Sequence, residues 1–501
     1  MDFFSNLIVG LNVAFQPYNL LFCFLGVFIG TLIGVLPGIG PVGTIAILLP
    51  VTFGISPTTA IILLAGIYYG AQYGGSTTSI LVNIPGEAAS VVTTLDGYQM
   101  ALQGRAGPAL GIAAFGSFIA GTTGVIGLQA LAPFLVSVAL RFGPPEYFSL
   151  LILGFILLTY LARKSMVKAL MMAGIGVLLG SIGLDTITGM TRFTLDIPEL
   201  LDGVGLAPLA MGLFGISEIL LNVEREIKHT IVTTQVKGLL PSIGDWARSI
   251  RPILRGTAIG FSLGLLPGGG ALISSFVSYA VEKRVSKHPE NFGKGAIEGV
   301  AAPESANNAA STGAFVPLLT LGIPSNATMA MLLGALMIHG ITPGPLLVKD
   351  HPALFWGVIS SMYVGNMMLL ALNLPLIGFW VQVLRVPYSL LFPLILFICL
   401  MGSYVLNNST VDVAFMVLFG VLGYLMRKFE YEPAPLVLAF VLSPLLENAL
   451  RKSLIISGGS FTIFLEHPIS VTCLGVAALL LIASFLSSLK DQRRIRTKKE
   501  E

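Results

Sequence analysis

Residues 34–40 read Gly-Val-Leu-Pro-Gly-Ile-Gly, and residues 264–270 read Gly-Leu-Leu-Pro-Gly-Gly-Gly. Both stretches lie inside long apolar segments. Proline lacks a backbone N–H and clashes with the preceding helical turn, and glycine tolerates dihedral angles that other residues avoid. Each stretch therefore predicts the end of a helix in apolar surroundings. Freed N–H groups at a helix start suit an anion, and freed carbonyls at a helix end suit a cation. A single Leu-Pro-Gly stretch, however, is equally typical of an ordinary helix kink.

The composition places the chain in a lipid bilayer. Its 501 residues are 54% hydrophobic and 11% charged, with a mean hydropathy of +0.87, whereas soluble domains carry roughly 25% charged residues. So little charge cannot cover a water-facing surface, which indicates an all-α polytopic membrane protein. The net charge of +3 comes without a basic, aromatic-rich patch, which excludes a nucleic-acid partner. The three cysteines, Cys23, Cys399 and Cys473, lack the spacing of a disulfide framework or a zinc site.

A membrane-crossing helix needs about 20 apolar residues, and the sequence predicts about 10 to 12 crossings. The candidate spans are residues 19–36, 108–138, 146–162, 166–184, 204–222, 256–281, 353–373, 387–405, 411–427, 433–450 and 469–489. Four further pieces are too short, too rich in glycine or too broken for a simple span, and they predict re-entrant segments: 42–54, 57–95, 292–325 and 326–342.

Basic residues in the loops set the orientation. The longest polar loop, 223–255, and the tail after Lys490 are rich in Lys and Arg and are predicted to be cytoplasmic. The acidic segment 185–202 fits the opposite face. Basic residues between Lys283 and Lys294 also fit the cytoplasm, which leaves the topology around 256–300 open.

Three features recur in the same order along the chain. Gly38 and Gly268 lie 230 residues apart, Ser76 and Ser311 lie 235 apart, and the prolines of two Ile-Pro pairs, Pro85 and Pro324, lie 239 apart. The spacing predicts two homologous repeats of inverted topology, each with a broken helix, as in secondary transporters with a site at the midplane. The predicted parts are an N-terminal interfacial segment 1–17, transmembrane repeats 18–222 and 256–470, the cytoplasmic linker 223–255, and the last span end and basic cytoplasmic tail 471–501.

Small polar residues follow each helix breaker. Residues 74–79 read Gly-Gly-Ser-Thr-Thr-Ser, and residues 307–312 read Asn-Asn-Ala-Ala-Ser-Thr. Hydroxyl and amide groups suit coordination of Na⁺ or hydrogen bonding to a carboxylate, and they also serve as contacts between membrane helices. A helix, a polar tip and an extended turn at the Ile-Pro pair together predict a re-entrant hairpin in each repeat, with close packing as the alternative.

Glu304 lies in the Pro-Glu-Ser-Ala-Asn stretch 303–307. Charges in apolar segments are costly and often functional, so this carboxyl could carry a proton or bind a cation, or be a paired interfacial group. Glu87 is a weaker candidate of the same kind. The sequence has no P-loop, GxSxG or HExxH motif, which argues against an enzyme and for energy from an ion gradient or a partner.

Residues 34–50, 68–86 and 302–324 together resemble the large membrane subunit of tripartite tricarboxylate transporters, the TctA-like family, and the resemblance covers about residues 15–470. It implies a multi-pass protein of the bacterial inner membrane without a cofactor. It also implies two partners, a small membrane subunit (TctB-like) and a periplasmic solute-binding protein (TctC-like). The substrate would be a carboxylate taken up with Na⁺ or H⁺.

The motifs and this resemblance give the candidate substrate- and ion-binding residues. They are Pro37, Gly38, Gly40, Gly75, Ser76, Thr77, Thr78, Ser79, Pro85 and Gly86 in the first half, and Pro267, Gly268, Gly270, Glu304, Asn307, Asn308, Ser311, Thr312 and Pro324 in the second. No tightly bound metal is expected, only a transported Na⁺. Gly269-Gly270 replaces Ile39-Gly40 in the second copy, which predicts a softer break and two unequal sites.

The sequence thus predicts the large subunit of a binding-protein-dependent secondary transporter importing a di- or tricarboxylate. The alternative is a channel or facilitator for small organic anions that works without an ion gradient. The identity of the carboxylate, the choice between Na⁺ and H⁺, and the oligomeric state stay open.

Overall fold

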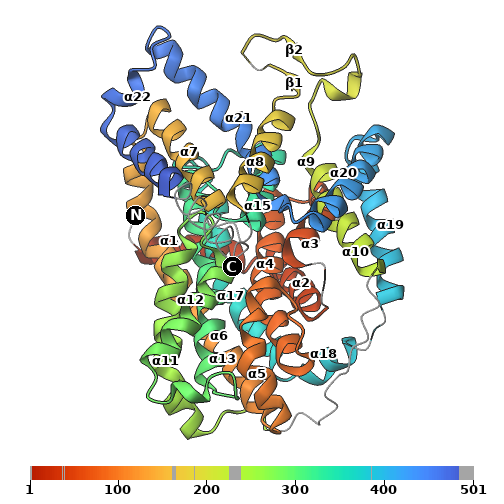
Figure 1. Cartoon of the computed structure of the whole chain (residues 1–501), viewed down its shortest axis with the longest axis vertical. Helices are drawn as coiled ribbons and strands as arrows, with labels where there is room; N and C mark the ends of the chain where they lie inside the picture. Colours follow the sequence, from red (N-terminus) through yellow and green to blue (C-terminus); the bar gives the residue numbers. More distant parts are fainter. Residues whose placement is uncertain are drawn as a thin grey trace, which may run out of the picture. The chain divides into compact units, whose positions relative to one another are not determined.

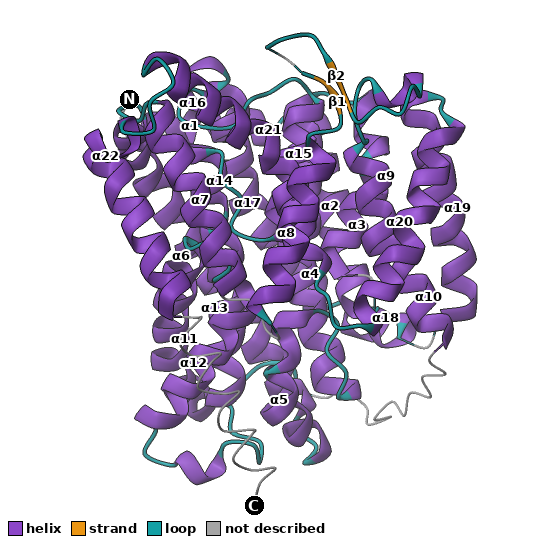
Figure 2. Ribbon diagram, turned by 45° about the horizontal axis from the view of Figure 1, so that its top comes forward, coloured by secondary structure: helices purple, strands orange, loops and turns teal. Residues whose placement is uncertain are grey.

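The computed structural model describes residues 3–36, 38, 40–160, 165–185, 187–224, 238–384, 386 and 388–483. Figure 2 shows that these residues are helical apart from loops and one short antiparallel hairpin, β1 (Gly183–Leu184) and β2 (Thr191–Arg192). Six of the described helices are long and apolar enough to cross a membrane. The prediction of an all-α polytopic membrane protein is confirmed.

The chain divides into two compact units, and both are discontinuous in sequence. The first unit holds residues 1–137 and 205–425, and the second holds 138–204 and 426–501. Neither unit coincides with a predicted repeat, so the two repeats stay a prediction.

The first unit contains most of the helices. They are α1 (Phe3–Ala14), α2 (Pro17–Val35), α3 (Gly40–Leu48), α4 (Pro57–Val82), α5 (Thr93–Leu102), α6 (Ala106–Ala139), α9 (Leu206–Ala210), α10 (Ser217–Glu224), α11 (Ile243–Gly264), α12 (Gly270–Val285), α13 (Glu298–Gly313), α14 (Phe315–Leu321), α15 (Ala327–Ile338), α16 (Leu347–Asp350), α17 (Pro352–Asn373), α18 (Ile377–Val383), α19 (Tyr388–Asn407) and α20 (Thr410–Lys428). Short 3₁₀ turns lie at Pro50–Gly54, Ala88–Val91 and Pro289–Asn291, and a π-helical turn joins α9 to α10 at Met211–Ile216.

The second unit is smaller. It holds α7 (Pro144–Tyr160), α8 (Met166–Gly180), α21 (Pro433–Ile456), α22 (Ile463–Glu466), a last described helix Pro468–Ala483, a 3₁₀ turn Pro198–Leu200, and the β1–β2 hairpin. Arg451 of α21 bonds Asp185 next to the hairpin, at 2.8 Å. Asp185 also accepts the backbone N–H groups of Ile187 and Thr188. The backbone donor at Ile187 and then the Arg451 guanidinium hold the pKa of Asp185 well below its ordinary range.

Helices α2 and α4 pack with their backbones in direct contact. A Cβ built at Gly26, Gly30 or Gly34 of α2 would lie only 2.4, 2.5 and 2.3 Å from a carbonyl oxygen of α4. The oxygens belong to Leu63, Ile67 and Ala71. Only glycine permits this approach, which is the small-residue packing typical of membrane helices.

Helices α11 and α13 pack in the same way. Gly256, Gly260 and Gly264 lie against the carbonyl oxygens of Ala302, Ala306 and Ala310, where a Cβ would be 2.3, 2.1 and 2.4 Å away. The glycines lie 230 residues after those of α2, and the carbonyls lie 239 residues after those of α4. The offset of 239 is also that of the Ile-Pro pairs. By this register Ser76 corresponds to Phe315 rather than to Ser311, so the two hydroxyl clusters do not occupy matching packing positions.

Both Leu-Pro-Gly stretches interrupt a helix where the sequence predicts it. α2 ends at Val35 and α3 begins at Gly40, with positive φ angles of 126° at Gly38 and 65° at Gly40. α11 ends at Gly264 and α12 begins at Gly270, and Gly268 and Gly270 also have positive φ. Pro37 lies outside the described residues.

The hydroxyl cluster 76–79 lies in the last turns of α4, and the re-entrant hairpin over 57–95 stays a prediction. α4 is one uninterrupted helix of 26 residues that runs through this cluster and ends at Val82, and Asn83 follows in the left-handed conformation. Gly74 does not break the helix because it packs against Thr31 O, 2.2 Å from where a Cβ would lie. In the second half the helix is divided at Ala314, and α14 ends at Gly322, also left-handed.

The predicted linker 223–255 is partly helical. α11 begins at Ile243, because Ser242 and Asp245 form a reciprocal N-terminal cap. Residues 225–237 of this linker, and 484–501 of the predicted tail, lie outside the described residues.

Candidate functional site

Glu304 of α13 lies at the centre of a buried polar cluster in the first unit. Its side chain is fully buried. One carboxyl oxygen accepts a hydrogen bond from Ser76 of α4 at 2.5 Å, and the other accepts one from Thr93 at the start of α5. The carboxyl therefore joins helices from the two predicted halves, 228 residues apart in sequence.

Asp96 holds α5 in the place that lets Thr93 reach Glu304. The fully buried Asp96 carboxyl accepts the backbone N–H groups of Gly293, Gly295 and Ala296 at 2.8 to 2.9 Å. Its second oxygen accepts the hydroxyl of Tyr279 of α12 at 2.9 Å. Figure 1 shows α5 beside α13, and the bond to Tyr279 also links α5 to α12.

A second buried carboxyl, Glu87, lies near the first. It accepts the backbone N–H of Ala89 at 2.8 Å and the amide N–H of Asn307 at 3.4 Å. The Oδ1 atom of Asn307 has no hydrogen-bond partner in the described part of the chain. Among the residues that the structure describes, neither Glu304 nor Glu87 forms an ion pair with a basic side chain.

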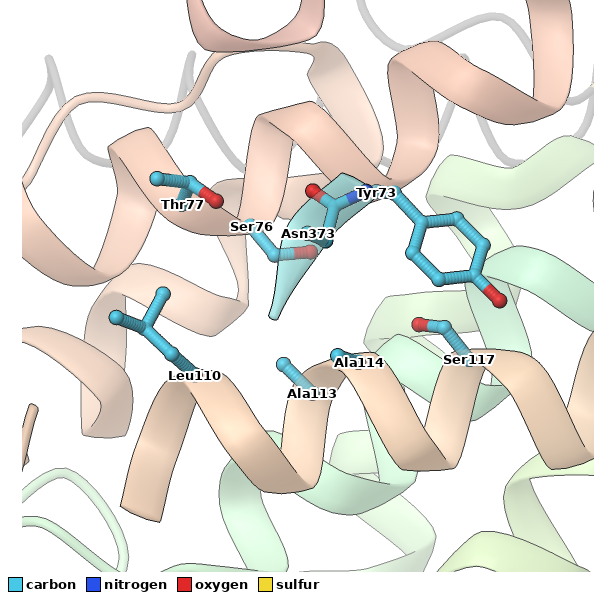
Figure 3. Close-up of a pocket in the computed structure, with 8 residues that line it drawn as sticks. All are labelled: Tyr73, Ser76, Thr77, Leu110, Ala113, Ala114, Ser117 and Asn373. Atoms are coloured by element: carbon cyan, nitrogen blue, oxygen red, sulfur yellow. The ribbon is translucent and has the colours of Figure 1, made fainter. Parts of the chain in front are cut away.

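A small cleft lies beside Glu304, between α4, α6 and α17. Its lining is one face of α4 (Tyr73, Ser76, Thr77), one face of α6 (Leu110, Ala113, Ala114, Ser117) and Asn373 at the end of α17. The spacing of three and four residues on α4 and α6 places these side chains on a single face of each helix. Figure 3 shows the hydroxyls of Ser76 and Ser117 pointing into the space between the two helices.

Two polar atoms of the cleft lack a partner. The hydroxyl of Tyr73 and the Oδ1 atom of Asn373 belong to residues that are only 3% and 6% exposed, and they form no hydrogen bond with the residues that the structure describes. Buried polar groups are normally satisfied, so these atoms are free to bind a ligand. Asn308 reaches the same cleft indirectly, because its amide donates to the Ser117 hydroxyl at 2.7 Å.

The cleft offers hydroxyl and amide groups rather than fixed charges. Such groups donate hydrogen bonds to a carboxylate or, through their oxygens, coordinate a hard cation. Within the described part of the chain, no group of three or more His, Cys, Asp or Glu side chains is placed to hold a metal ion.

The structure separates the predicted site residues into three groups. Ser76, Thr77 and Glu304 lie in or beside the cleft, and Asn307 and Asn308 lie one turn further along α13. A second group lies where a helix break meets an Ile-Pro turn: Gly38, Gly40, Gly75, Pro85 and Gly86 in the first half, and Pro267, Gly268, Gly270 and Pro324 in the second. A third group bonds backbone carbonyls and so has a structural role here: Thr78 to Val35 O, Ser79 to Ser90 O, and Ser311 and Thr312 to Asn308 O.

Each Ile-Pro turn contacts the neighbouring helix break. A Cβ on Gly86 would lie 1.8 Å from Gly34 O at the end of α2. In the second half the backbone N–H of Gly268 donates to Ser325 O at 2.8 Å. The break and the turn therefore form one compact element in each half, separate from the cleft lining.

Four residues of this site escaped the sequence reasoning: Tyr73, Thr93, Ser117 and Asn373. Tyr73 directly precedes the glycine pair of the recognised motif, which was a usable signal. Ser117, Thr93 and Asn373 are single polar residues near or within apolar runs, and only the tertiary structure brings them together.

Comparison with known proteins gives a consistent result. The family model described as "Tripartite tricarboxylate transporter TctA family" matches residues 20–438. The "Uncharacterized 52.8 kDa protein in TAR-I ttuC' 3'region" of Agrobacterium vitis is 51% identical over 493 residues, 98% of each chain. A second Agrobacterium vitis protein, "Uncharacterized protein in TAR-II ttuC' 3'region", is 52% identical over 234 residues, which cover 47% of this chain and 97% of that relative. No solved structure matches the chain.

Proposed function

Because the chain belongs to the tripartite tricarboxylate transporter TctA family, we propose that it is the large translocating subunit of a transporter that imports a di- or tricarboxylate. The observation that carries the proposal is the cleft between α4 and α6, where unpartnered polar atoms lie next to the buried Glu304. A transporter needs such a site between helices rather than a continuous pore.

Neutral donors suit a substrate that must be bound and then released. The hydroxyls of Tyr73 and Ser117 can each donate to a carboxylate oxygen, and Ser76 can do so when it does not donate to Glu304. None of the lining residues carries a fixed positive charge, so the substrate is not held by a strong ion pair. Selection among carboxylates would then rest largely with the separate binding protein.

The architecture is proposed to be two repeats of inverted topology around this site. The support is the recurring packing of α2 with α4 and of α11 with α13, in which glycines meet carbonyls with constant offsets of 230 and 239 residues. In such transporters one repeat moves against the other around a site at the midplane.

The family further suggests a small membrane subunit and a periplasmic solute-binding protein as partners, and the bacterial inner membrane as the location. An ion gradient supplies the energy, and no cofactor is required.

The test is uptake by proteoliposomes that contain the chain, its small membrane subunit and a purified binding protein, with [¹⁴C]citrate and [¹⁴C]succinate as probes. Ser76→Ala and Tyr73→Phe each remove one hydroxyl that faces the cleft. A hydrogen bond to a charged group contributes about 1.5–3 kcal/mol, so uptake at low probe concentration should fall about 10-fold to 150-fold.

Tyr73→Phe is the sharper variant, because the hydroxyl it removes has no hydrogen-bond partner among the residues described. The thermal stability of this variant should therefore equal or exceed that of the wild type. The matched control is Ser453→Ala, which removes a buried hydroxyl that bonds only its own helix at Ala449 O, and it should transport normally. Normal uptake in both cleft variants would refute the assignment of the site.

A further inference from the structure

The Glu304 carboxyl lies in the protein interior, and no described residue supplies a countercharge to it. It is 0% exposed, and its two oxygens are bonded by the hydroxyls of Ser76 and Thr93 rather than by a basic side chain. Burial without a countercharge disfavours an ionised carboxylate and favours a neutral acid. Hydroxyls are compatible with both states, since they can donate to the ion or accept from the acid.

The titratable groups around Glu304 include no free cation among the described residues. Tyr73 faces it from α4, and Glu87 faces it from the segment that precedes the 3₁₀ turn Ala88–Val91. On α5, the Asp96 carboxyl is turned to backbone N–H groups and Tyr279. On the neighbouring helices, Arg255 of α11 pairs with Glu282 of α12, and Arg248 of α11 pairs with Asp245 and Glu298. The remaining basic side chains of α11 and α12, Arg251, Lys283 and Arg284, are exposed.

The protonation state of Glu304 decides what Ser76 can offer to the cleft. While the carboxyl is ionised, Ser76 donates its only hydroxyl proton to it, so that only oxygen lone pairs face the cleft. A carboxylate ligand also needs a donor and is repelled by a negative charge on Glu304 in this buried setting. Both effects oppose binding of an anion.

Protonation reverses both effects. A proton added to one Glu304 oxygen removes the charge and makes that oxygen a donor to Ser76 or Thr93. The Ser76 hydroxyl is then free to donate to a ligand, beside the unpartnered hydroxyl of Tyr73. Binding of a proton to Glu304 therefore favours binding of a carboxylate at this site, and binding of the carboxylate favours protonation.

We infer that Glu304 is the proton-binding residue that couples uptake to the pH gradient, so that the driving ion is H⁺. In each cycle one proton adds to the Glu304 carboxylate on the side where substrate binds, and the same proton is lost on the side where substrate leaves. The inference rests on the proposed function for its role in transport, but proton binding by Glu304 is testable by itself.

The first experiment is an infrared pH titration of the full chain in lipid vesicles. One carbonyl-stretch band, assigned to the protonated Glu304 carboxyl, is expected to disappear as the pH rises in the wild type and in Glu87→Gln. The same band should be absent from Glu304→Gln at every pH. If Glu304→Gln retains every titrating carboxyl band of the wild type, the inference is wrong, whatever the protein transports.

The second experiment compares accumulation with exchange in the reconstituted three-component system, with [¹⁴C]citrate and [¹⁴C]succinate. An outside-acid gradient of about 1 pH unit without Na⁺ should concentrate a transported probe up to about tenfold for each coupled proton. Glu304→Gln keeps the hydrogen-bonding capacity but cannot titrate. It should accumulate the probe about onefold under every pH gradient, while internal probe still exchanges for external probe at equal pH at a measurable rate.

The outcomes separate the two proposals. Accumulation driven by Na⁺ alone, or accumulation by Glu304→Gln equal to that of the wild type, would overturn the inference and leave the transporter in place. Loss of both accumulation and exchange in Glu304→Gln, with normal behaviour of Glu87→Gln, would assign Glu304 a binding role instead of proton coupling. Absence of uptake and of exchange by the wild type under every gradient would count against the proposed function, and the infrared titration would then decide proton binding.

Discussion

Replacing Gly260 by alanine tests whether the close approach of α11 and α13 positions Glu304. A Cβ at Gly260 would lie 2.1 Å from Ala306 O and 2.6 Å from Ala306 Cα. Ordinary contact begins at 3.4 Å, so the helices must separate by 3.4 − 2.1 = 1.3 Å at this point. The obstructing atoms are backbone, and no side-chain rotation can relieve the clash.

Two consequences follow from this separation. Overpacking in a tightly packed interior costs about 1–3 kcal/mol. Glu304 lies two residues before Ala306 on the same helix, and it bonds Ser76 at 2.5 Å. A displacement on the order of 1 Å takes this contact beyond normal hydrogen-bond length, so Gly260→Ala should lower both stability and coupled uptake.

The assay is an unfolding titration from mild detergent into a denaturing detergent, together with uptake in proteoliposomes. The control is Gly244→Ala in the first turn of the same helix, where the nearest atom to the new Cβ would be 3.7 Å away. Removing glycine from an unobstructed helical site stabilises by up to about 1 kcal/mol. The reasoning is refuted if Gly260→Ala is as stable and as active as Gly244→Ala.

Two further predictions concern buried and paired carboxylates. Asp96→Ala leaves three backbone N–H groups and the Tyr279 hydroxyl without an acceptor. The free energy of unfolding in the same titration should therefore fall by about 3 kcal/mol or more. Asp96→Asn retains an acceptor oxygen, so an equal loss of stability in both variants would contradict this explanation. The pKa of Asp185 is lowered by the Ile187 N–H and by Arg451. The ionised Asp185 therefore stabilises the folded state above the ordinary pKa of about 3.9, and this stabilisation is lost as the pH falls through the lower pKa of the folded state. The difference in Tm between wild type and Asp185→Asn should be constant from about pH 8 to 5 and shrink below about 4, and a difference unchanged in acid would refute the ion pair.

The helix breaks were predictable because their causes are local. Proline and glycine at 37–40 and 267–270 act on their own backbone, and the helices end at Val35 and Gly264 as expected. The sequence leaves open whether the cluster at 76–79 is helical, because serine, threonine and glycine are compatible with a buried helix when a neighbouring helix packs against them. Gly74, for example, serves the contact with α2 rather than a turn.

The sequence by itself determined that the protein lies in a lipid bilayer, that it is helical, and where its helices break. Composition and short-range backbone chemistry suffice for those properties. The tertiary structure decided which polar residues form the site. Ser76 and Glu304 meet across 228 residues, and Tyr73, Ser117 and Asn373 join them from three helices. The physical reason is that a buried hydrogen bond depends on the rotation and register of packed helices. Here that register depends on backbone contacts at glycines such as Gly260, where a single methyl group decides how closely two helices approach.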